Sequence, residues 1–564
     1  MLIVVMGASG ASESVGTALA ARLGLPCYDA DAFQTAENRA KLARGEVLGD
    51  GDCWPWLEAL AASVPRWEAA GGAVLTSGVL KLAYRDVLLK NASASSVVCL
   101  GPEEGSAGAQ IMPASLRAEE VVERVRLARV AEGEALRGVV HFAEGGIDAD
   151  IGAERSAELL DSMLARLGPL RRVLLLPPDG TRRHSGAGEI TSFLYQRLAA
   201  RAEVEVLPAL GTHVAMSEAE IAEMFPGIPL SAFRVHDFRK GLRQLGEVPA
   251  SFVEHVSEGL VSYPVRCAVN ARLIEGRFDR IISIGQLVPH EVVGIANHNK
   301  NVFVGVGGKD IIDRTHFIGA AYGMERMMGR AQTPVRAVLD YMAGQFARDL
   351  PITYVLTVRQ RDSDGVMHTR GLYAGDDEAC FHAGVPLVQR VNLELLEAPL
   401  KKVVVYLDPA EFKSTWLGNK AIYRTRLAIA DGGELVIVAP GVKSFGEDAG
   451  IDRLIRKHGY RGTERTLERV KSDPDLGESL SAAAHLIHGS SEGRFRIRYA
   501  TGGLQRSEVE DAGYEYGDCA ELCRRYDPAR LRDGMNRLPD GDEFFYVSNP
   551  ALGLWGLRAN FPRF

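Results

Sequence analysis

Short apolar runs alternate with amphipathic stretches along the chain, which predicts an α/β protein. The first apolar run, Leu2–Met6, has the length of a buried strand and leads into a turn rich in Gly and Ser. Val15, Leu19 and Leu23 then recur at the spacing of one helix face. A strand, a turn and a helix in this order indicate the start of an α/β unit.

This first unit is expected to span residues 1–168. Another buried strand is predicted at Ala73–Thr76, and a helix at Ala153–Leu167 is expected to close the unit. Gly168–Arg172 has the composition of a linker.

Two further lobes are predicted, at residues 172–394 and 395–564. In the first of them the expected strands are Val173–Leu176, Val204–Leu207, Ile281–Ile284 and Val302–Val304. They alternate with helical patterns at Ser217–Met224 and Pro334–Phe346, which favours a parallel sheet with crossover helices. In the second lobe the pattern restarts with a strand at Val403–Leu407, a helix at Ala421–Ala430, a turn at Asp431–Gly433 and a strand at Leu435–Val438.

The composition is that of an ordinary globular protein. Of 564 residues, 46% are hydrophobic and 24% are charged, and the formal net charge is -8. The acidic balance argues against a general nucleic-acid binder, and no apolar run approaches the roughly 20 residues that span a bilayer. Seven scattered cysteines fit free thiols in a reducing compartment. We therefore expect a cytoplasmic protein with no nucleic-acid or membrane partner.

The turn after the first strand has the layout of a phosphate-binding loop without its cation. Ser12, Glu13 and Ser14 stand where a working loop has Gly, Lys and Ser or Thr. The lysine of such a loop contacts phosphate oxygens, whereas the carboxylate of Glu13 would repel them. Taken alone, this turn is a strand-to-helix connection without a ligand.

Beyond the turn, the first unit resembles the gluconokinases over nearly its whole length. The matching stretches are Tyr28–Asp31, Asn38–Gly45, Asp50–Leu57, Leu80–Lys81, Tyr84–Asp86 and Met112–Leu116. Glu13 is one departure from the gluconokinase sequences, and there are two more. Gln34–Thr35 replaces a His-Pro pair, and Glu103–Ser106 replaces an arginine-bearing lid. The resemblance thus implies a P-loop kinase-like domain that has lost kinase activity, and that serves in assembly or binds a sugar acid.

A second group of reactive side chains follows in the middle of the chain. It comprises Asp179, Arg182, His213, His290, Lys300 and His316. Each histidine, taken singly, is more often a structural residue than a ligand. Together, beside predicted strand ends and loops, they indicate a site that moves protons near a metal.

This group resembles the lactate racemase family in composition and order. Further matches are His236–Asp237, Asn270, Ile284–Gly285, Gly305–Gly308 and Lys420. The resemblance implies a two-lobed α/β module and the nickel-pincer nucleotide that this family carries. Separate maturation enzymes would have to supply that cofactor.

The resemblance also implies roles for single residues. Lys300 would tether the cofactor covalently, and His316 would bind nickel, which accepts imidazole in a square-planar site. His213 and His290 would be two acid/base groups, one for each enantiomer.

Other implied roles concern the substrate and the cofactor phosphate. Lys420 would hold the substrate carboxylate, and Arg182 would bind either that carboxylate or the cofactor. Asp179 would orient this arginine or a cofactor hydroxyl. Gly307 and Gly308 either approach the cofactor phosphate or form a simple tight turn.

One departure from the lactate enzymes lies beside the tether. Asn297–Asn299 stands where those enzymes have a glycine-rich approach to the lysine. The change alters backbone freedom next to Lys300, and it puts His298 in a position to contact the cofactor or a polyhydroxy substrate.

The expected reaction is racemisation or epimerisation at C2 of a 2-hydroxy acid. Removing the C2 hydrogen as a hydride avoids a second negative charge beside the carboxylate, and it requires a hydride acceptor and two bases. The gluconokinase-like unit favours D-gluconate or a related aldonic acid as substrate. The alternatives are lactate or another short 2-hydroxy acid, a sugar-acid kinase, a nickel or cofactor delivery protein, and a dehydrogenase that releases the keto acid.

Overall fold

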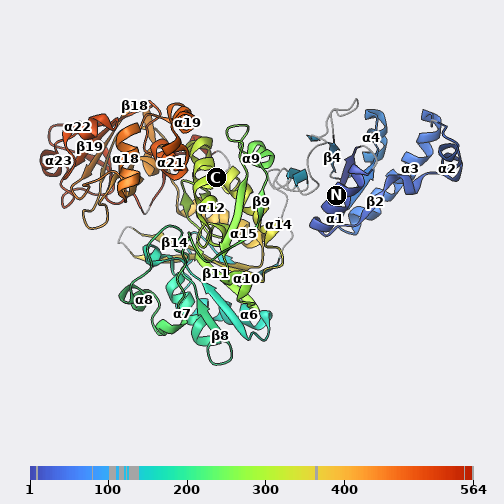
Figure 1. The fold of residues 1–564 in the computed structure, drawn as a ribbon, viewed down its shortest axis with the longest axis horizontal. Helices are drawn as coiled ribbons and strands as arrows, with labels where there is room; N and C mark the ends of the chain where they lie inside the picture. Colours follow the sequence, from blue (N-terminus) through green and yellow to red (C-terminus); the bar gives the residue numbers. More distant parts are fainter. Residues whose placement is uncertain are drawn as a thin grey trace. The chain divides into compact units, whose positions relative to one another are not determined.

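The computed structural model divides into two compact units, Met1–Ala135 and Leu136–Phe564. It describes residues 1–7, 10–46, 48–78, 80–93, 95–100, 110–112, 120–121, 124–125, 139–362, 366–551 and 553–561. Glu103–Ser106, which stand in place of the arginine-bearing lid, and all of Met112–Leu116 except Met112 lie outside the described residues. Each unit is described by itself (Figure 1).

The first unit is built on a five-stranded parallel sheet in the order β2-β3-β1-β4-β5. The strands are β1 (Leu2–Met6), β2 (Cys27–Asp29), β3 (Ala73–Ser77), β4 (Ser95–Leu100) and β5 (Gln110–Met112). Its helices are α1 (Ala11–Leu23), α2 (Ala36–Ala43), α3 (Asp50–Ala69) and α4 (Leu82–Leu89), with a 3₁₀ turn at Ala30–Phe33. The strand and helix predicted at the start of the chain are confirmed.

Both faces of this sheet are buried, as a continuously apolar strand requires. Leu2 and Val4 of β1 pack with α3 on one face, whereas Ile3 and Val5 pack with α1 on the other. Successive residues of a strand point to opposite faces, so β1 contributes to two cores at once. The expected α/β class of the first domain is therefore confirmed.

The central lobe of the second unit contains a six-stranded mixed sheet in the order β6-β15-β14-β11-β7-β8. Its strands are β6 (Val140–Gly145), β7 (Arg172–Leu176), β8 (Glu203–Val206), β11 (Arg280–Gln286), β14 (Ile352–Arg361) and β15 (Met367–Gly375). The β14-β11-β7-β8 part is parallel, but β15 and β6 are added antiparallel. The main helices are α6 (Ala153–Leu167), α7 (Ala187–Leu198), α12 (Lys309–Tyr322), α14 (Pro334–Phe346) and α15 (Glu378–Val391).

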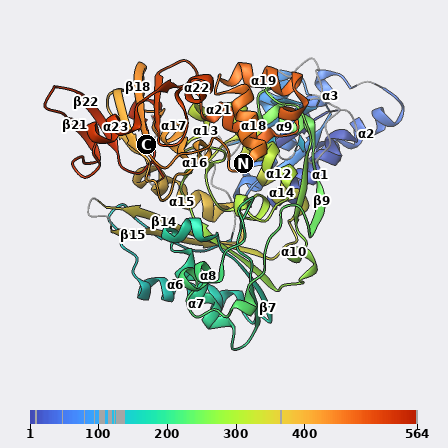
Figure 2. The same ribbon diagram turned by 60° about the vertical axis from the view of Figure 1, so that its left-hand side comes forward.

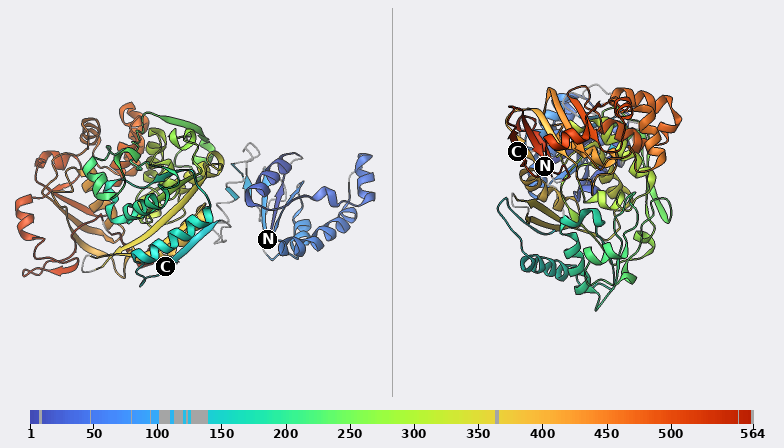
Figure 3. Two further views of the ribbon diagram at one scale, coloured as in Figure 1. Left: turned by 90° about the horizontal axis from the view of Figure 1, so that it is seen from below. Right: turned by 90° about the vertical axis from the view of Figure 1, so that its left-hand side faces the viewer.

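Three sequence-based expectations need correction here. The domain boundary expected at 168 lies earlier, because β6 pairs with β15 and α6 packs into the core of this lobe (Figure 3). Val302–Val304, expected as a strand, falls in and just after helix α11 (Asn299–Phe303). The sheet is mixed rather than purely parallel. Short apolar runs do not distinguish a buried strand from a buried helical turn.

The C-terminal lobe has its own six-stranded sheet in the order β20-β19-β18-β17-β22-β21. Its strands are β17 (Leu400–Tyr406), β18 (Ile429–Ala439), β19 (Arg496–Thr501), β20 (Glu515–Tyr516), β21 (Gly534–Arg537) and β22 (Glu543–Val547). The connecting helices include α16 (Thr415–Gly418), α17 (Lys420–Thr425), α18 (Ala449–His458), α19 (Thr463–Ser472), α21 (Leu480–His488), α22 (Arg506–Asp511) and α23 (Cys519–Arg525). The helix expected at Ala421–Ala430 is shorter, since β18 already begins at Ile429.

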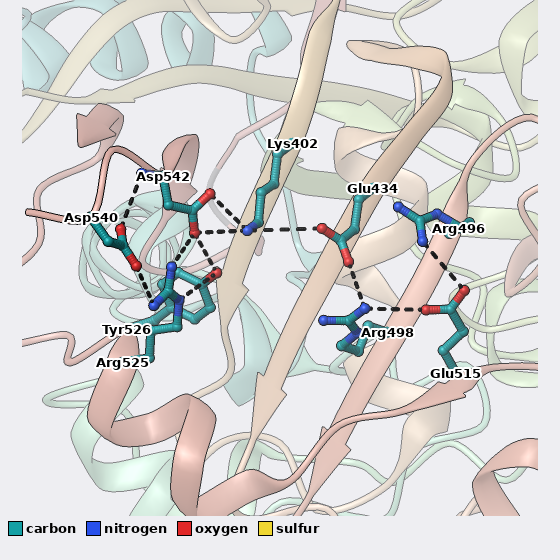
Figure 4. Close-up of polar contacts among 9 residues, drawn as sticks. All are labelled: Lys402, Glu434, Arg496, Arg498, Glu515, Arg525, Tyr526, Asp540 and Asp542. Atoms are coloured by element: carbon teal, nitrogen blue, oxygen red, sulfur yellow. Dashed lines mark hydrogen bonds and ion pairs between the residues drawn. The ribbon is translucent and has the colours of Figure 1, made fainter. Parts of the chain in front are cut away.

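A chain of ion pairs crosses neighbouring strands of this sheet (Figure 4). Lys402 of β17 lies 2.8 Å from Asp542 and 3.8 Å from Glu434 of β18. Glu434 continues the chain to Arg498 of β19 at 3.2 Å. Every charge in this chain has an opposite charge beside it, so it ties neighbouring strands together. The carboxyl ends of the strands, where ligands bind in open α/β sheets, lie at the other edge.

The two lobes of the second unit contact each other through helices and a short strand pair. Helix α21 packs against α12 (Figures 1 and 2). Strand β23 (Trp555–Leu557) returns from the end of the chain to pair with β16 (Glu394–Leu396). Among the described residues, no helix has the length and apolarity needed to cross a membrane.

Candidate functional site

The predicted site residues of the central lobe gather after the carboxyl ends of its parallel strands. Asp179 caps the 3₁₀ turn η2 (Gly180–Ser185) after β7, and His213 follows β8. His290 lies in the short strand β12 (Pro289–His290) after β11. This edge is where the topology of an open parallel sheet places ligands.

His213 and Asp179 form a hydrogen-bonded pair. The His213 Nδ1 lies 2.6 Å from Oδ2 of the buried Asp179, whose other oxygen accepts from Thr181. Burial raises the pKa of Asp179, but the His213 hydrogen bond and charge outweigh it, and the net pKa is lowered. An ionised Asp179 accepts a hydrogen bond from the Nδ1–H of His213. The proton of the half-exposed ring therefore sits on Nδ1, and the Nε2 lone pair is free to act as a base.

His290 is buried and has a different hydrogen bond. Its Nδ1 accepts the backbone N–H of Val292 at 3.0 Å, so the neutral ring carries its proton on Nε2. Burial lowers the pKa of His290 well below its usual value, and the nearby cations Lys300, Arg424 and Arg182 lower it further. His213 and His290 therefore present opposite tautomers.

Lys300 combines burial with an unusually acidic ammonium group. It lies in α11, and no carboxylate of the described residues is within ion-pair distance of its Nζ. Burial, followed by the charge of Arg182, lowers its pKa to about 8, although Glu291 and Asp179 act in the opposite direction. A lysine of this kind is partly a free amine near neutral pH and can act as a nucleophile.

The backbone leading to Lys300 adopts a conformation that glycine normally provides. Asn297 and His298 have φ angles of 68° and 57°. The Asn297 Oδ1 accepts the His298 N–H at 2.8 Å, and the Arg336 guanidinium donates to the Asn297 carbonyl. The glycine-like geometry is thus kept although the glycines are replaced.

His298 itself faces the protein interior. Its ring packs against that of Tyr354 in a tilted arrangement with centroids 3.8 Å apart, and its Nε2 lies 3.1 Å from the Asp377 carbonyl oxygen. Burial lowers the pKa of His298 well below its usual value, so the ring is neutral. The expected contact of His298 with a cofactor or substrate is therefore replaced by a packing role.

His316 is prepared to bind a metal through one nitrogen. Its Nδ1 donates to the Ile312 carbonyl at 2.6 Å, one turn earlier in α12, which leaves the Nε2 lone pair free. Burial, followed by the charge of Lys300, lowers the pKa of His316, so the imidazole is neutral as a metal ligand must be. Since the charge of Lys300 acts on His316, the two side chains lie near each other.

Two cations face this site, and neither has an anionic partner in the part of the chain that the structure describes. Arg182 donates only to its neighbour Thr181, and Lys420 of α17 lies over the Phe412 ring with no carboxylate of the described chain in ion-pair range. Burial, followed by the charge of Arg182, lowers the pKa of Lys420. Arg182 belongs to the central lobe and Lys420 to the C-terminal lobe, so the site is shared between the lobes.

The sequence interpretation missed three members of the site. Glu291 lies 3.7 Å from His290 Nδ1, and Arg424 of α17 lies 3.8 Å from Glu291 and donates to the Pro289 carbonyl at 3.0 Å. His488 of α21 is buried, and Glu291 and His316 both influence its pKa, which burial lowers to about 4. Glu291 is adjacent to a predicted base and could have been noticed; nothing in the sequence distinguishes Arg424 or His488.

The glycines of the predicted phosphate contact have a packing reason. A Cβ on Gly307 would lie 1.7 Å from the Phe303 carbonyl oxygen, and one on Gly308 would lie 2.9 Å from Leu242. The Gly308 N–H donates to Ala268 and that of Gly307 to Val304. These amides are engaged within the protein, which favours the tight-turn alternative. His236 supports the same turn, because its Nε2 lies 3.1 Å from the Gly307 carbonyl oxygen.

In the first unit, the residues that depart from the gluconokinases serve the local fold. Thr35 caps α2 by accepting the Asn38 N–H, and the buried Gln34 accepts from the Asn38 side chain at 2.9 Å. Glu13 is exposed in the first turn of α1, where a carboxylate stabilises the positive helix end. Ala8 and Ser9 of the loop lie outside the described residues.

Comparison with known proteins agrees with this division. Residues 158–327 match the family model of the lactate racemase N-terminal domain. A crystal structure of a protein from Thermotoga maritima aligns with 73% of this chain and 100% of its own, with TM-score 0.62 and 24% identity. The lactate racemase apoprotein of Thermoanaerobacterium thermosaccharolyticum aligns with 72% of this chain and 90% of its own, with TM-score 0.53 and 15% identity. These two likenesses concern the fold.

The other similarity is to gluconokinases. A probable gluconokinase of Mus musculus is 44% identical over 94 residues, which are 16% of this chain and 51% of that protein. The thermosensitive gluconokinase of Escherichia coli is 35% identical over 89 residues, 15% of this chain and 48% of that protein. The chain spans about half the length of the curated relatives it matches. The chain thus combines a segment that matches the lactate racemase N-terminal domain, residues 158–327, with an N-terminal region that is similar to gluconokinases.

Proposed function

We propose that this chain is a racemase or epimerase that inverts C2 of a 2-hydroxy acid, with D-gluconate or a related aldonic acid as preferred substrate. The observation that carries the proposal is the pair of histidines with opposite tautomers in one site with two unpaired cations. A reaction that runs through either enantiomer needs two proton-transfer groups, whereas a binding or delivery protein does not.

The chain's own residues would bind and orient the acid. Lys420 and Arg182 have unneutralised charges from opposite lobes, and either can pair with the C1 carboxylate. His213 would accept the C2 hydroxyl proton at Nε2, with Asp179 holding the ring and stabilising the imidazolium. His290 would serve the other enantiomer.

The residues present fit the nickel-pincer nucleotide of the lactate racemases. Lys300 offers an amine with lowered pKa for covalent attachment, and His316 offers a free Nε2. The bound nucleotide would supply the hydride acceptor for the C2 hydrogen. Loading it requires partner enzymes that make and deliver the cofactor.

The test is NMR of the matured protein with D-gluconate and a panel of shorter 2-hydroxy acids in D₂O. Inversion at C2 with little deuterium incorporated there is the expected result. Rapid deuterium exchange at C2 would contradict hydride transfer, and net formation of a keto acid would indicate a dehydrogenase. Inversion of lactate but not of gluconate would refute the substrate preference.

We propose further that the gluconokinase-like region has no kinase activity. Glu13 replaces the phosphate-binding lysine, and the remaining charges near α3 neutralise one another, as with Lys41 and Asp52 at 2.7 Å. The full chain should not phosphorylate D-gluconate with ATP and Mg²⁺, measured against a working gluconokinase. Stoichiometric formation of a phosphogluconate would overturn this part.

A further inference from the structure

The two histidines of the site each have a carboxylate nearby, but at different distances. Asp179 Oδ2 lies 2.6 Å from His213 Nδ1, within hydrogen-bond range. Glu291 Oε2 lies 3.7 Å from His290 Nδ1, which is too long for a hydrogen bond. The His290 Nδ1 accepts the Val292 N–H instead.

This resting contact conflicts with proton transfer at the opposite nitrogen. A histidine that accepts a proton at Nε2 must already carry a proton at Nδ1, and its imidazolium carries both. The same holds in reverse when the imidazolium gives up the Nε2 proton. Every state that His290 passes through in such a transfer therefore has an Nδ1–H, which cannot point at the Val292 N–H.

The side chain of Glu291 has an acceptor without a hydrogen bond. Its Oε2 is buried and makes no hydrogen bond among the described residues, although the rule for buried polar atoms is that they are paired. Its nearest cation is Arg424 Nη2, at 3.8 Å. Coulombic attraction holds this oxygen beside the imidazole without occupying its lone pairs.

The carboxylate of Glu291 offsets the positive charges that surround His290. Lys300 of α11, Arg424 of α17 and Arg182 of η2 all disfavour a second proton on the ring. Glu291 is the neighbouring group that favours it. Its carboxylate remains ionised because the pKa of Glu291 is lowered, the charges of His290 and Arg424 outweighing the effect of burial.

We propose that Glu291 is the positioning residue of His290, so that the site contains two carboxylate–histidine pairs, Asp179–His213 and Glu291–His290. In the reacting state the ring leaves the Val292 amide and changes tautomer by exchange with water: Nε2 gives up its proton, Nδ1 takes one up, and the new Nδ1–H donates to Glu291 Oε2. The substrate hydroxyl proton then moves to Nε2, and the imidazolium returns it from Nε2 after inversion. The catalytic part of this inference rests on the proposed function; the pairing itself does not.

The pairing is tested on the full chain without cofactor. Long-range ¹H–¹⁵N correlation of ¹⁵N-labelled histidines reports the protonation state of both ring nitrogens. The His290 signals are assigned by their loss in H290Q. The E291Q variant should move double protonation of His290 to lower pH, because its neutral amide no longer stabilises the imidazolium, and E291D should restore part of the shift. Signals of His213 should not change.

A matched control removes another partly buried carboxylate at a remote edge of the same unit. Glu434 pairs with Arg498 at 3.2 Å, so E434Q loses an ion pair without touching the site. It should leave the His290 signals as in the wild type. Unchanged His290 protonation in E291Q would overturn the pairing, and so would equal shifts of His290 and His213, which indicate a general structural change.

The kinetic arm uses the matured enzyme. E291Q should lower kcat/KM about 10²-fold, the scale of one misplaced acid/base group, and E291D should recover activity. The loss must be equal in both directions, since a catalyst leaves the equilibrium constant unchanged. Wild-type rates in E291Q would overturn the positioning role. Inactivity of the wild type with every 2-hydroxy acid, together with the expected His290 shift, would instead refute the proposed function and leave the pairing intact.

Discussion

The two halves of this chain treat their charges in opposite ways. In the gluconokinase-like region, Lys81 pairs with Asp50 at 2.8 Å and Lys41 pairs with Asp52 at 2.7 Å. In the lactate racemase-like module, Lys300 and Lys420 are partly buried without a carboxylate of the described residues in ion-pair range, and burial lowers their pKa values. Both of these lysines of the first region are thus neutralised by carboxylates, whereas the two lysines of the second keep their charges at an energetic cost.

This difference separates an inherited fold from a maintained site. A buried cation without a partner destabilises the folded state, so it persists where a ligand later supplies the missing interaction. A cation already paired with a carboxylate must break that pair before it can bind an anionic substrate. Both regions are similar to known proteins, but unpaired cations that could bind an anionic ligand are found in the second region.

Removing the Lys300 amine should have the largest effect. Lys300→Ala should abolish covalent retention of the cofactor, because the attaching nitrogen is gone. Intact-mass spectrometry and nickel analysis of the purified, matured protein measure this directly. Lys401→Ala, at an exposed lysine far from the site, is the matched control and should load normally. Full nickel occupancy and activity in Lys300→Ala would refute covalent attachment of the cofactor through Lys300.

Asp179→Asn should have the next largest effect. The amide no longer fixes the proton on His213 Nδ1, so the ring loses the tautomer that keeps Nε2 free. We expect kcat to fall by about 10²- to 10⁴-fold, the range known for the loss of a histidine-orienting carboxylate or of an acid/base group. Substrate KM should change little. A fall of only a few-fold would mean that Asp179 acts on something other than His213.

The reactivity of Lys300 should depend on pH in a predictable direction. Its pKa of about 8 means that the free amine is the minor form at lower pH. The rate of cofactor attachment should therefore rise about tenfold per pH unit up to about 8 and then level off. Time courses of covalent loading at fixed cofactor concentration measure it. A rate that still rises steeply above pH 9 would show that the ammonium is not destabilised.

Several elements of the fold, and the loss of the loop lysine, could be predicted from the sequence. The strands at Leu2–Met6 and Ile281–Ile284 and the helix at Pro334–Phe346 are strongly patterned and appear where expected. The loss of the P-loop lysine is local and visible in one residue, Glu13. These features could be predicted because each is determined by residues that lie close together along the chain.

What could not be predicted depends on contacts distant in the chain. The helix at Ala153–Leu167 is expected from sequence to close the first unit, but the strand before it, β6, pairs with β15, which lies more than 200 residues later. The roles of Arg424 and His488 arise because α17 and α21 of the C-terminal lobe face the central site. The tautomers of His213 and His290 depend on one carboxylate and one backbone amide, which no spacing rule locates.

The smallest predicted effect concerns the strained approach to Lys300, where the maintained site also stores backbone strain. Asn297 has a φ of 68°, and its Oδ1 accepts the His298 N–H. Asn297→Ala and Asn297→Gly both lose that hydrogen bond, but only glycine is relaxed in the left-handed region, so the alanine variant should be less stable by about 1 kcal/mol. At Asn299, the first residue of α11, the order should reverse, because glycine weakens a helix by up to about 1 kcal/mol relative to alanine. Urea unfolding of the cofactor-free chain measures both pairs. If alanine were the more stable residue at both positions, the approach would not be strained, and the replacement of glycines beside the tether would need another explanation.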